Sequence, residues 1–132
     1  MRSLVTRFIP DEHYERSMFS FGLLLYLAVI VFGSIPGARA EFNDVASGVV
    51  LHLTAYSCIA FFLAAGTNGS TPRKAVVSFL LVAAMGAVDE GIQSLLPYRH
   101  GAVADWGIDL VAGLLTATLF WLASARQSVL QR

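Results

Sequence analysis

Four acids, one amide and one arginine lie between residues 89 and 109, with long apolar runs on both sides. The pattern is Asp89-Glu90-x2-Gln93-x5-Arg99-x5-Asp105-x3-Asp109. Buried carboxylates can act as general acids or bases, and a guanidinium can bind phosphate or carboxylate through two parallel hydrogen bonds. Ionisable groups at membrane depth are costly, so they usually pair with one another or face a wet cavity. We therefore expect the function of the protein to reside in this segment.

The composition indicates that the elements carrying these residues lie in a membrane. Of the 132 residues, 56% are hydrophobic and only 14% are charged, and the mean hydropathy is +0.66. Soluble domains usually have about 25% charged residues. Four apolar stretches, at residues 17–35, 45–65, 75–96 and 103–123, are each long enough to cross a hydrocarbon core of about 30 Å. The net charge of zero gives no reason to expect a nucleic-acid partner.

Polar connectors with proline and glycine separate these stretches, so the sequence predicts an all-α, integral membrane, four-helix transmembrane bundle. We expect a cytoplasmic or interfacial segment at residues 1–16, the bundle at 17–124 and a cytoplasmic tail at 125–132. With both termini in the cytoplasm, seven Lys and Arg residues lie on that side and two outside, as the positive-inside rule favours. Ala38-Arg39-Ala40 resembles a signal-peptide cleavage site. The apolar run before it exceeds the usual length of about 7–15 residues, which favours an uncleaved first helix.

Polar residues of three predicted helices fall at one depth. His52, Glu90 and Asp109 lie roughly 9–11 Å inward from the outer ends of their stretches, at about 1.5 Å per residue, and Asp89 lies beside them. Gln93 can share a helix face with either Asp89 or Glu90, because residues three and four apart are neighbours on a helix surface. The sequence therefore predicts a polar layer to which three helices contribute.

Small residues crowd the third and fourth stretches, and in membranes such residues let helix backbones approach closely. They are Gly86, Gly91, Gly107 and Gly113. We therefore expect the third and fourth helices to form a tight pair with the acids between them. On the second helix, Tyr56 follows His52 by one turn, and we expect its hydroxyl to reach the same polar layer.

Arg99 has two interpretations. As a structural residue it pairs with Glu90 or Asp105 and pins the hairpin between the third and fourth helices. As a functional residue it holds an anionic head group together with His100, while a buried carboxylate acts as an acid or base. The residue pattern alone does not decide between these interpretations.

A metal site has little support in the spacing of the residues. His52, Glu90 and Asp109 could bind a divalent metal as one imidazole and two carboxylates. No motif such as H-E-x-x-H supports that arrangement. Cys58 is the lone cysteine, which excludes an intrachain disulfide and a cysteine metal cluster. The sequence therefore predicts no metal and no cofactor.

The polar pattern resembles the signature of the VanZ-like family. It runs Gly86-x2-Asp89-Glu90-x2-Gln93-x3-Pro97-x-Arg99-x5-Asp105-x3-Asp109-x3-Gly113, with His52-x3-Tyr56 on the preceding helix. The resemblance covers roughly residues 45–123. It implies a four-helix protein of the bacterial cytoplasmic (inner) membrane, from a cell-envelope family related to antibiotic resistance, with its polar motif near one membrane face. Two departures are Ser47-Gly48-Val49, where the family often has Asp-Lys before the histidine, and Asp109, where it often has asparagine.

Together these observations predict a small multi-pass membrane protein with an outward-facing polar site for an anionic lipid-linked or cell-envelope ligand. We expect Glu90 and Asp105 to act as acid or base if the protein is an enzyme, which the residues do not decide. The predicted ligand-binding residues are Gln93, Arg99, His52, Asp89 and Asp109. The alternative is a non-catalytic accessory subunit of a larger membrane complex, whose buried acids only pin two helices. The expected partners are membrane lipids, a lipid-linked anionic ligand or such a complex.

Overall fold

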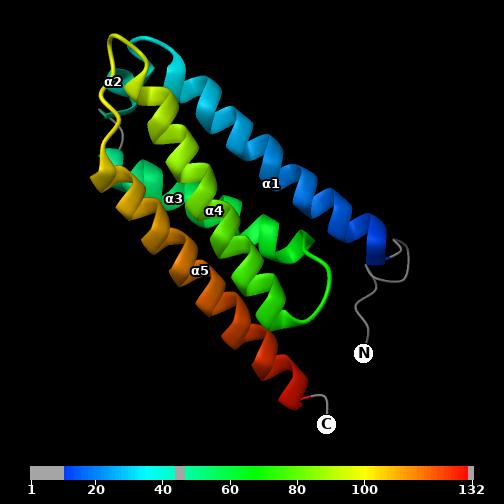
Figure 1. Cartoon of the computed structure of the whole chain (residues 1–132). Coiled ribbons are helices and arrows are strands. Elements are labelled where there is room, and N and C mark those ends of the chain that lie inside the picture. Colours follow the sequence, from blue (N-terminus) through cyan, green and yellow to red (C-terminus); the bar gives the residue numbers. More distant parts are fainter. Residues whose placement is uncertain (1–10, 44–46, 131–132) are drawn as a thin grey trace.

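The computed structural model describes residues 11–43 and 47–130, and every regular element within those ranges is a helix. The helices are α1 (Asp11–Ser34), α2 (Ala38–Asn43), α3 (Gly48–Gly66), α4 (Thr71–Ser94) and α5 (Val103–Leu130). Helix α2 has six residues and lies in the first connector, whereas the other helices are long (Figure 1). The prediction of an all-α fold is therefore confirmed.

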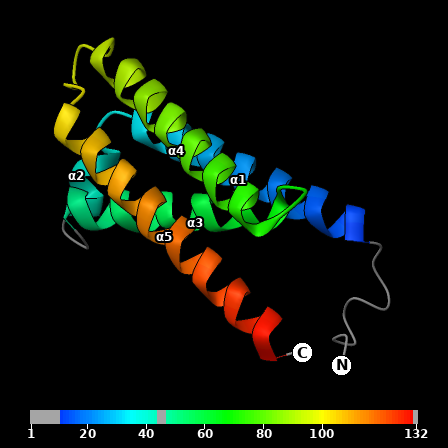
Figure 2. The ribbon, with the colours of Figure 1, turned by 60° about the horizontal axis from the view of Figure 1, so that its bottom comes forward.

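Four helices are long and apolar enough to cross a membrane. The candidate spans are Glu12–Ser34, Gly48–Gly66, Thr71–Ser94 and Val103–Arg126. In Figures 1 and 2 the start of α1 and the end of α5 lie at the same end of the bundle, as an even number of crossings requires. These findings confirm the predicted four-helix transmembrane bundle of a multi-pass membrane protein.

The helix ends differ from the predicted boundaries where local chemistry favours a longer helix. Helix α1 begins at Asp11, and acidic residues such as Asp11 and Glu12 suit the first turn of a helix. Residues 11–16 of the predicted N-terminal segment therefore belong to α1, and residues 1–10 lie outside the described part of the chain. Helix α5 continues to Leu130, past the predicted end of the bundle at 124, because no glycine or proline lies between residues 124 and 130.

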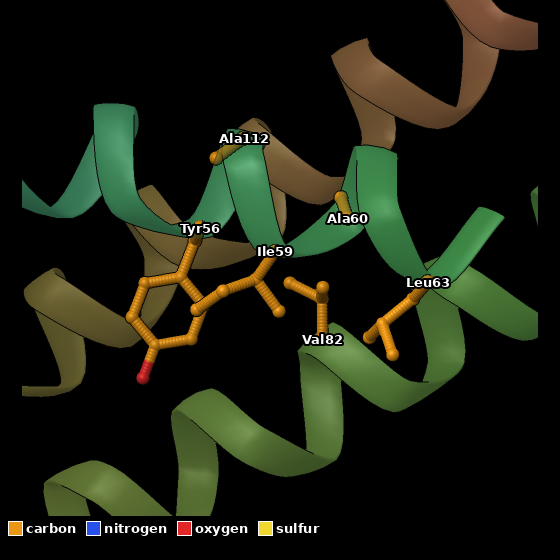
Figure 3. Packing of buried hydrophobic residues seen from close by; sticks show 6 residues of the cluster. All are labelled: Tyr56, Ile59, Ala60, Leu63, Val82 and Ala112. Atoms are coloured by element: carbon orange, nitrogen blue, oxygen red, sulfur yellow. The ribbon is translucent and has the colours of Figure 1, made fainter. Parts of the chain in front are cut away.

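Helix α3 is the centre of the bundle and packs against α1, α4 and α5 (Figure 1). Helix α4 also packs along α5, whereas α1 lies at the outside and has the smallest share of buried residues among the four candidate spans. The buried apolar cluster comes from three helices and consists of Tyr56, Ile59, Ala60, Leu63, Val82 and Ala112 (Figure 3). Figure 3 shows the Tyr56 hydroxyl pointing away from these apolar side chains, and it reaches Asp89 of α4. The core therefore borders directly on the polar layer.

Two of the glycines on α4 and α5 allow these helices to approach closely. A Cβ atom on Gly86 would lie 2.8 Å from a carboxylate oxygen of Asp109, and one on Gly113 would lie 2.9 Å from a valine side chain. Both distances are too short for a carbon atom, so any side chain there would force these neighbours to shift. At Gly91 and Gly107 a Cβ atom would meet nothing within 4 Å. The tight α4–α5 pair is confirmed, but the expectation that all four glycines contribute to it is wrong for these two.

Glycine also brings α3 against the backbone of α1. A Cβ atom on Gly66, the last residue of α3, would lie 2.2 Å from the backbone nitrogen of Phe19 and 2.7 Å from the backbone oxygen of Glu15. The Glu15 side chain also forms an ion pair with Lys74 of α4, with an Oε1–Nζ distance of 2.9 Å. The first half of α1 is therefore fixed to both α3 and α4.

Candidate functional site

The first of two polar groups joins α4 to α3 and to the loop before α5. Asp89 is 2% exposed, and each of its carboxylate oxygens accepts one hydrogen bond. The Tyr56 hydroxyl donates to Oδ2 at 2.9 Å, and the Gln93 side-chain amide donates to Oδ1 at 2.9 Å. Gln93 Oε1 in turn accepts a hydrogen bond from the Arg99 guanidinium. We call Tyr56, Asp89, Gln93 and Arg99 the Asp89 network.

Arg99 connects this network to the end of α1. Its Nη1 donates to the carbonyl oxygen of Gly33 at 2.6 Å, and the hydroxyl of the neighbouring Tyr98 donates to the carbonyl oxygen of Ser34 at 2.6 Å. The last carbonyl groups of a helix have no partner within the helix, so side-chain donors can satisfy them there. Arg99 therefore has a structural role through an amide and a backbone carbonyl, a pairing that the sequence did not predict.

The second group gathers around His52. His52 Nδ1 lies 2.9 Å from Asp109 Oδ1, and His52 Nε2 lies 3.9 Å from Asp105 Oδ2. Glu90 Oε2 accepts a hydrogen bond at 2.6 Å from the backbone N–H of Ala102, the residue that precedes α5. This carboxylate thereby satisfies an N–H group at a helix start, where the helix dipole also favours negative charge. We call His52, Glu90, Asp105 and Asp109 the His52 cluster.

Asp89 and Glu90 are neighbours in the sequence but belong to different groups. At 3.6 residues per turn, adjacent side chains on a helix point about 100° apart, so they cannot face the same neighbouring helix. Asp89 meets α3 through Tyr56, whereas Glu90 meets the start of α5. Gln93 could share a face with either acid, and in the structure it binds Asp89. The predicted polar layer is therefore confirmed, but α4 divides it into two groups.

A pocket of about 360 Å³ lies between α1, α3 and α4, beside the Asp89 network. Helix α1 gives it an apolar wall made by Leu25, Ala28, Val29 and Phe32. Helix α3 adds the apolar residues Leu51 and Ala55. Polar side chains from α3, α4 and the following loop also line it, namely His52, Tyr56, Asp89, Gln93 and Arg99. Glu90, Asp105 and Asp109 do not line it. We call this space the α1 pocket, and its volume falls in the usual range of ligand sites.

A second pocket, of about 290 Å³, lies on the side of Glu90 that faces the start of α5. Besides Glu90, residues of α4, of the loop and of α5 line it, among them Gly91, Gly101 and Trp106. Gly101 must be small, because a Cβ atom there would lie 2.3 Å from the backbone oxygen of Glu90. We call this space the α5 pocket. Glu90 therefore faces a different space from Asp89.

Every site residue that the sequence predicted belongs to one of the two groups. The sequence missed the N–H of Ala102 and the carbonyl of Gly33, because backbone groups leave no signal in residue types. It also missed Tyr26, whose hydroxyl donates to the backbone oxygen of Met85 at 3.0 Å and joins α1 to α4. Tyr26 is the one tyrosine in the first apolar stretch, and that isolated polar group could have indicated it.

Three side chains of the His52 cluster have the donor types of a metal site. His52, Glu90 and Asp109 can each offer one ligand atom, and these atoms all lie within 4.8 Å of one another. One imidazole and two carboxylates are a common ligand set for divalent metals. The site thus combines a mostly apolar pocket with a compact anionic cluster behind it.

Comparisons of this chain with protein-family models, with curated proteins and with solved structures found no match. The resemblance to the VanZ-like family stays a prediction that rests on the order of polar residues between His52 and Gly113. The function must therefore follow from the chemistry of the site itself.

Proposed function

We propose that this chain is a small protein of the bacterial inner membrane that binds an anionic, lipid-linked ligand of the cell envelope. The observation that carries the proposal is the α1 pocket, which has an apolar wall from α1 and polar side chains from α4 and the following loop. A lipid with an anionic head group has both kinds of surface. Ligand sites typically bury most of the ligand against apolar side chains and orient it with a few polar groups.

Arg99 supplies the positive charge for the head group. A guanidinium recognises phosphate and carboxylate through its planar set of donors. The hydrogen bonds of Arg99 to Gln93 and Gly33 hold it at the pocket before any ligand binds, so little side-chain freedom is lost on binding. Among the residues that the structure describes, Asp89 is the one acid that lines the pocket, and Tyr56 and Gln93 donate hydrogen bonds to its carboxylate. The other acids of the polar layer repel the head group less, because Coulomb energy falls with distance.

Binding is better supported than catalysis by this geometry. A general acid or base must lie within hydrogen-bond reach of the group whose proton it transfers, about 2.6–3.2 Å between heavy atoms or through one water. Glu90 and Asp105, the predicted acid or base residues, do not line the α1 pocket, and Glu90 lines the α5 pocket instead. The proposed function is therefore the capture or presentation of a lipid. Glu90 and Asp105 belong to the His52 cluster and do not contact the bound lipid.

Two sequence features support the place of this function in the cell. The distribution of Lys and Arg favours both termini in the cytoplasm, which puts the head-group side of the α1 pocket toward the outer face. The resemblance to the VanZ-like family favours a ligand of the cell envelope. Neither feature names the head group.

The proposal is tested by the binding of farnesyl phosphate and of farnesol, which share a lipid tail and differ in charge, to the purified protein in nanodiscs. Ala28→Phe fills the α1 pocket, whereas Leu27→Phe alters an adjacent residue that is 57% exposed toward the bilayer. We expect the protein and Leu27→Phe to bind farnesyl phosphate saturably and about tenfold or more tightly than farnesol. We expect Ala28→Phe to bind it at least about tenfold more weakly than the unchanged protein.

Equal binding of the phosphate and the alcohol would contradict a site for an anionic lipid. Equal binding by Ala28→Phe and the unchanged protein would place the lipid elsewhere on the surface. Absence of saturable binding, together with co-purification of larger subunits in native mass measurements, would favour the accessory-subunit alternative instead.

A further inference from the structure

Three helices each bring one metal-ligating side chain to the same point. His52 comes from α3, Glu90 from α4 and Asp109 from α5, and their ligand atoms all lie within 4.8 Å of one another. Each position lies inside a candidate membrane span, four to six residues from its end. Such groups are rare at membrane depth and usually have a function.

The two carboxylates of this set each keep one buried oxygen without a hydrogen-bond partner. Asp109 is fully buried and Glu90 is 8% exposed. Asp109 Oδ1 interacts with His52, and Glu90 Oε2 accepts from the N–H of Ala102. Within the described part of the chain, Asp109 Oδ2 and Glu90 Oε1 have no partner. A buried acceptor without a partner is costly and calls for an explanation such as a bound ion.

The charges around this point favour a cation. Glu90 and Asp109 bring two carboxylates to one imidazole at this point. A divalent cation would balance two of the carboxylate charges in a region of low dielectric constant.

We propose that His52, Glu90 and Asp109 bind one divalent metal ion, of a kind that accepts nitrogen and oxygen ligands, such as Zn²⁺ or Mn²⁺. Ligands at about 2.1 Å from a metal lie at most about 4.2 Å apart, so small side-chain rotations close the observed set around an ion. Asp105 is placed to orient the imidazole from outside the ligand set. The depth of these three residues predicted that they meet. No local spacing marks them as a metal motif, because each ligand comes from a different helix.

The metal site goes beyond the proposed lipid binding and stands without it. Glu90 lines the α5 pocket and His52 lines the α1 pocket, so the ion would lie between the two spaces. The ion would be structural, would offset the charge of the nearby acids, and would leave the apolar wall of the α1 pocket untouched. Failure of metal binding therefore leaves the lipid experiment intact, and the reverse also holds.

The test is direct metal binding by the full chain, purified in detergent and stripped with a chelator. Titration with Zn²⁺ and with Mn²⁺ should show one ion per chain for at least one of these metals. Glu90→Gln, Asp109→Asn and His52→Gln should each weaken binding by about tenfold or more. Two matched controls on exposed residues, Glu41→Gln and His13→Gln, should bind like the unchanged protein.

X-ray absorption of the loaded wild-type protein gives a second readout that needs no variant. For the Zn²⁺ form, we expect nitrogen and oxygen neighbours at about 2.0–2.2 Å and a histidine signature. Saturating metal should also raise the thermal midpoint of the unchanged protein and not that of His52→Gln. A stripped wild-type protein that binds neither metal in a one-to-one ratio would overturn the proposal. The same conclusion follows from a sulfur neighbour, which only Cys58 or methionine could supply, or from unchanged binding by the three folded variants.

Discussion

Removal of the Tyr56 hydroxyl should destabilise the protein, because the buried Asp89 carboxylate would lose a hydrogen-bond donor. Tyr56 is fully buried, Asp89 is 2% exposed, and the hydroxyl donates to Oδ2 at 2.9 Å. Hydrogen bonds to charged groups contribute about 1.5–3 kcal/mol in soluble proteins, whereas polar pairs between membrane helices average about 0.6 and reach about 1.7 kcal/mol. The bond is buried and made to a carboxylate, so we expect a coupling energy near the upper membrane value, about 1–2 kcal/mol.

A double-mutant cycle isolates this coupling. The free energy of unfolding would be measured in one detergent for the unchanged protein, Tyr56→Phe, Asp89→Asn and the double variant. We expect the two substitutions to be non-additive by about 1–2 kcal/mol. Tyr98→Phe is the matched control, because its hydroxyl donates to the carbonyl of Ser34 and not to an acid. Its cycle with Asp89→Asn should be additive within about 0.5 kcal/mol. Additive effects of Tyr56→Phe and Asp89→Asn would refute the reasoning.

Two further predictions concern the packing and the orientation of the bundle. Gly86→Ala should lower the thermal midpoint in detergent, because its Cβ atom would press on the Asp109 carboxylate at a cost of about 1–3 kcal/mol. Gly91→Ala on the same helix should be neutral or stabilising by up to about 1 kcal/mol, and equal midpoints for the two variants would contradict the close contact. In a Cys58→Ser background, His100→Cys should react with a membrane-impermeant thiol reagent in intact cells, and Thr71→Cys should not. The opposite labelling pattern would invert the proposed orientation.

The architecture could be predicted because hydropathy dominates it. Four apolar stretches separated by polar connectors are enough to predict four membrane helices, and the structure contains them. The boundaries were less certain, because helix ends depend on local chemistry that a hydropathy average does not register. Helix α5 passes the predicted end at 124, and α2 forms inside a segment predicted as a connector.

The sequence could predict that the polar residues lie at one depth, but not which acid binds which partner. Residue depth follows from position in a helix, so the meeting of His52, Glu90 and Asp109 was predictable. Which acid binds which partner depends on how each helix is rotated against its neighbours, and one sequence does not contain that rotation. For this reason the pairing of Gln93 with Asp89 rather than Glu90 emerged only from the structure. The backbone partners of Arg99 and Glu90 were invisible for a different reason, since every residue has the same N–H and C=O groups.

Helix α1 is the wall of the α1 pocket and also the helix with the most surface turned to the bilayer. A lipid that binds there is drawn from the membrane and not from water, so its relevant concentration is its mole fraction among the surrounding lipids. A lipid present at about one molecule in a thousand would half-fill the pocket with a standard free energy of only about −4 kcal/mol on that scale. Added detergent dilutes the ligand and empties the pocket without any change in affinity. Occupancy in the cell would then follow the lipid composition of the membrane, whatever the solubility of the ligand in water.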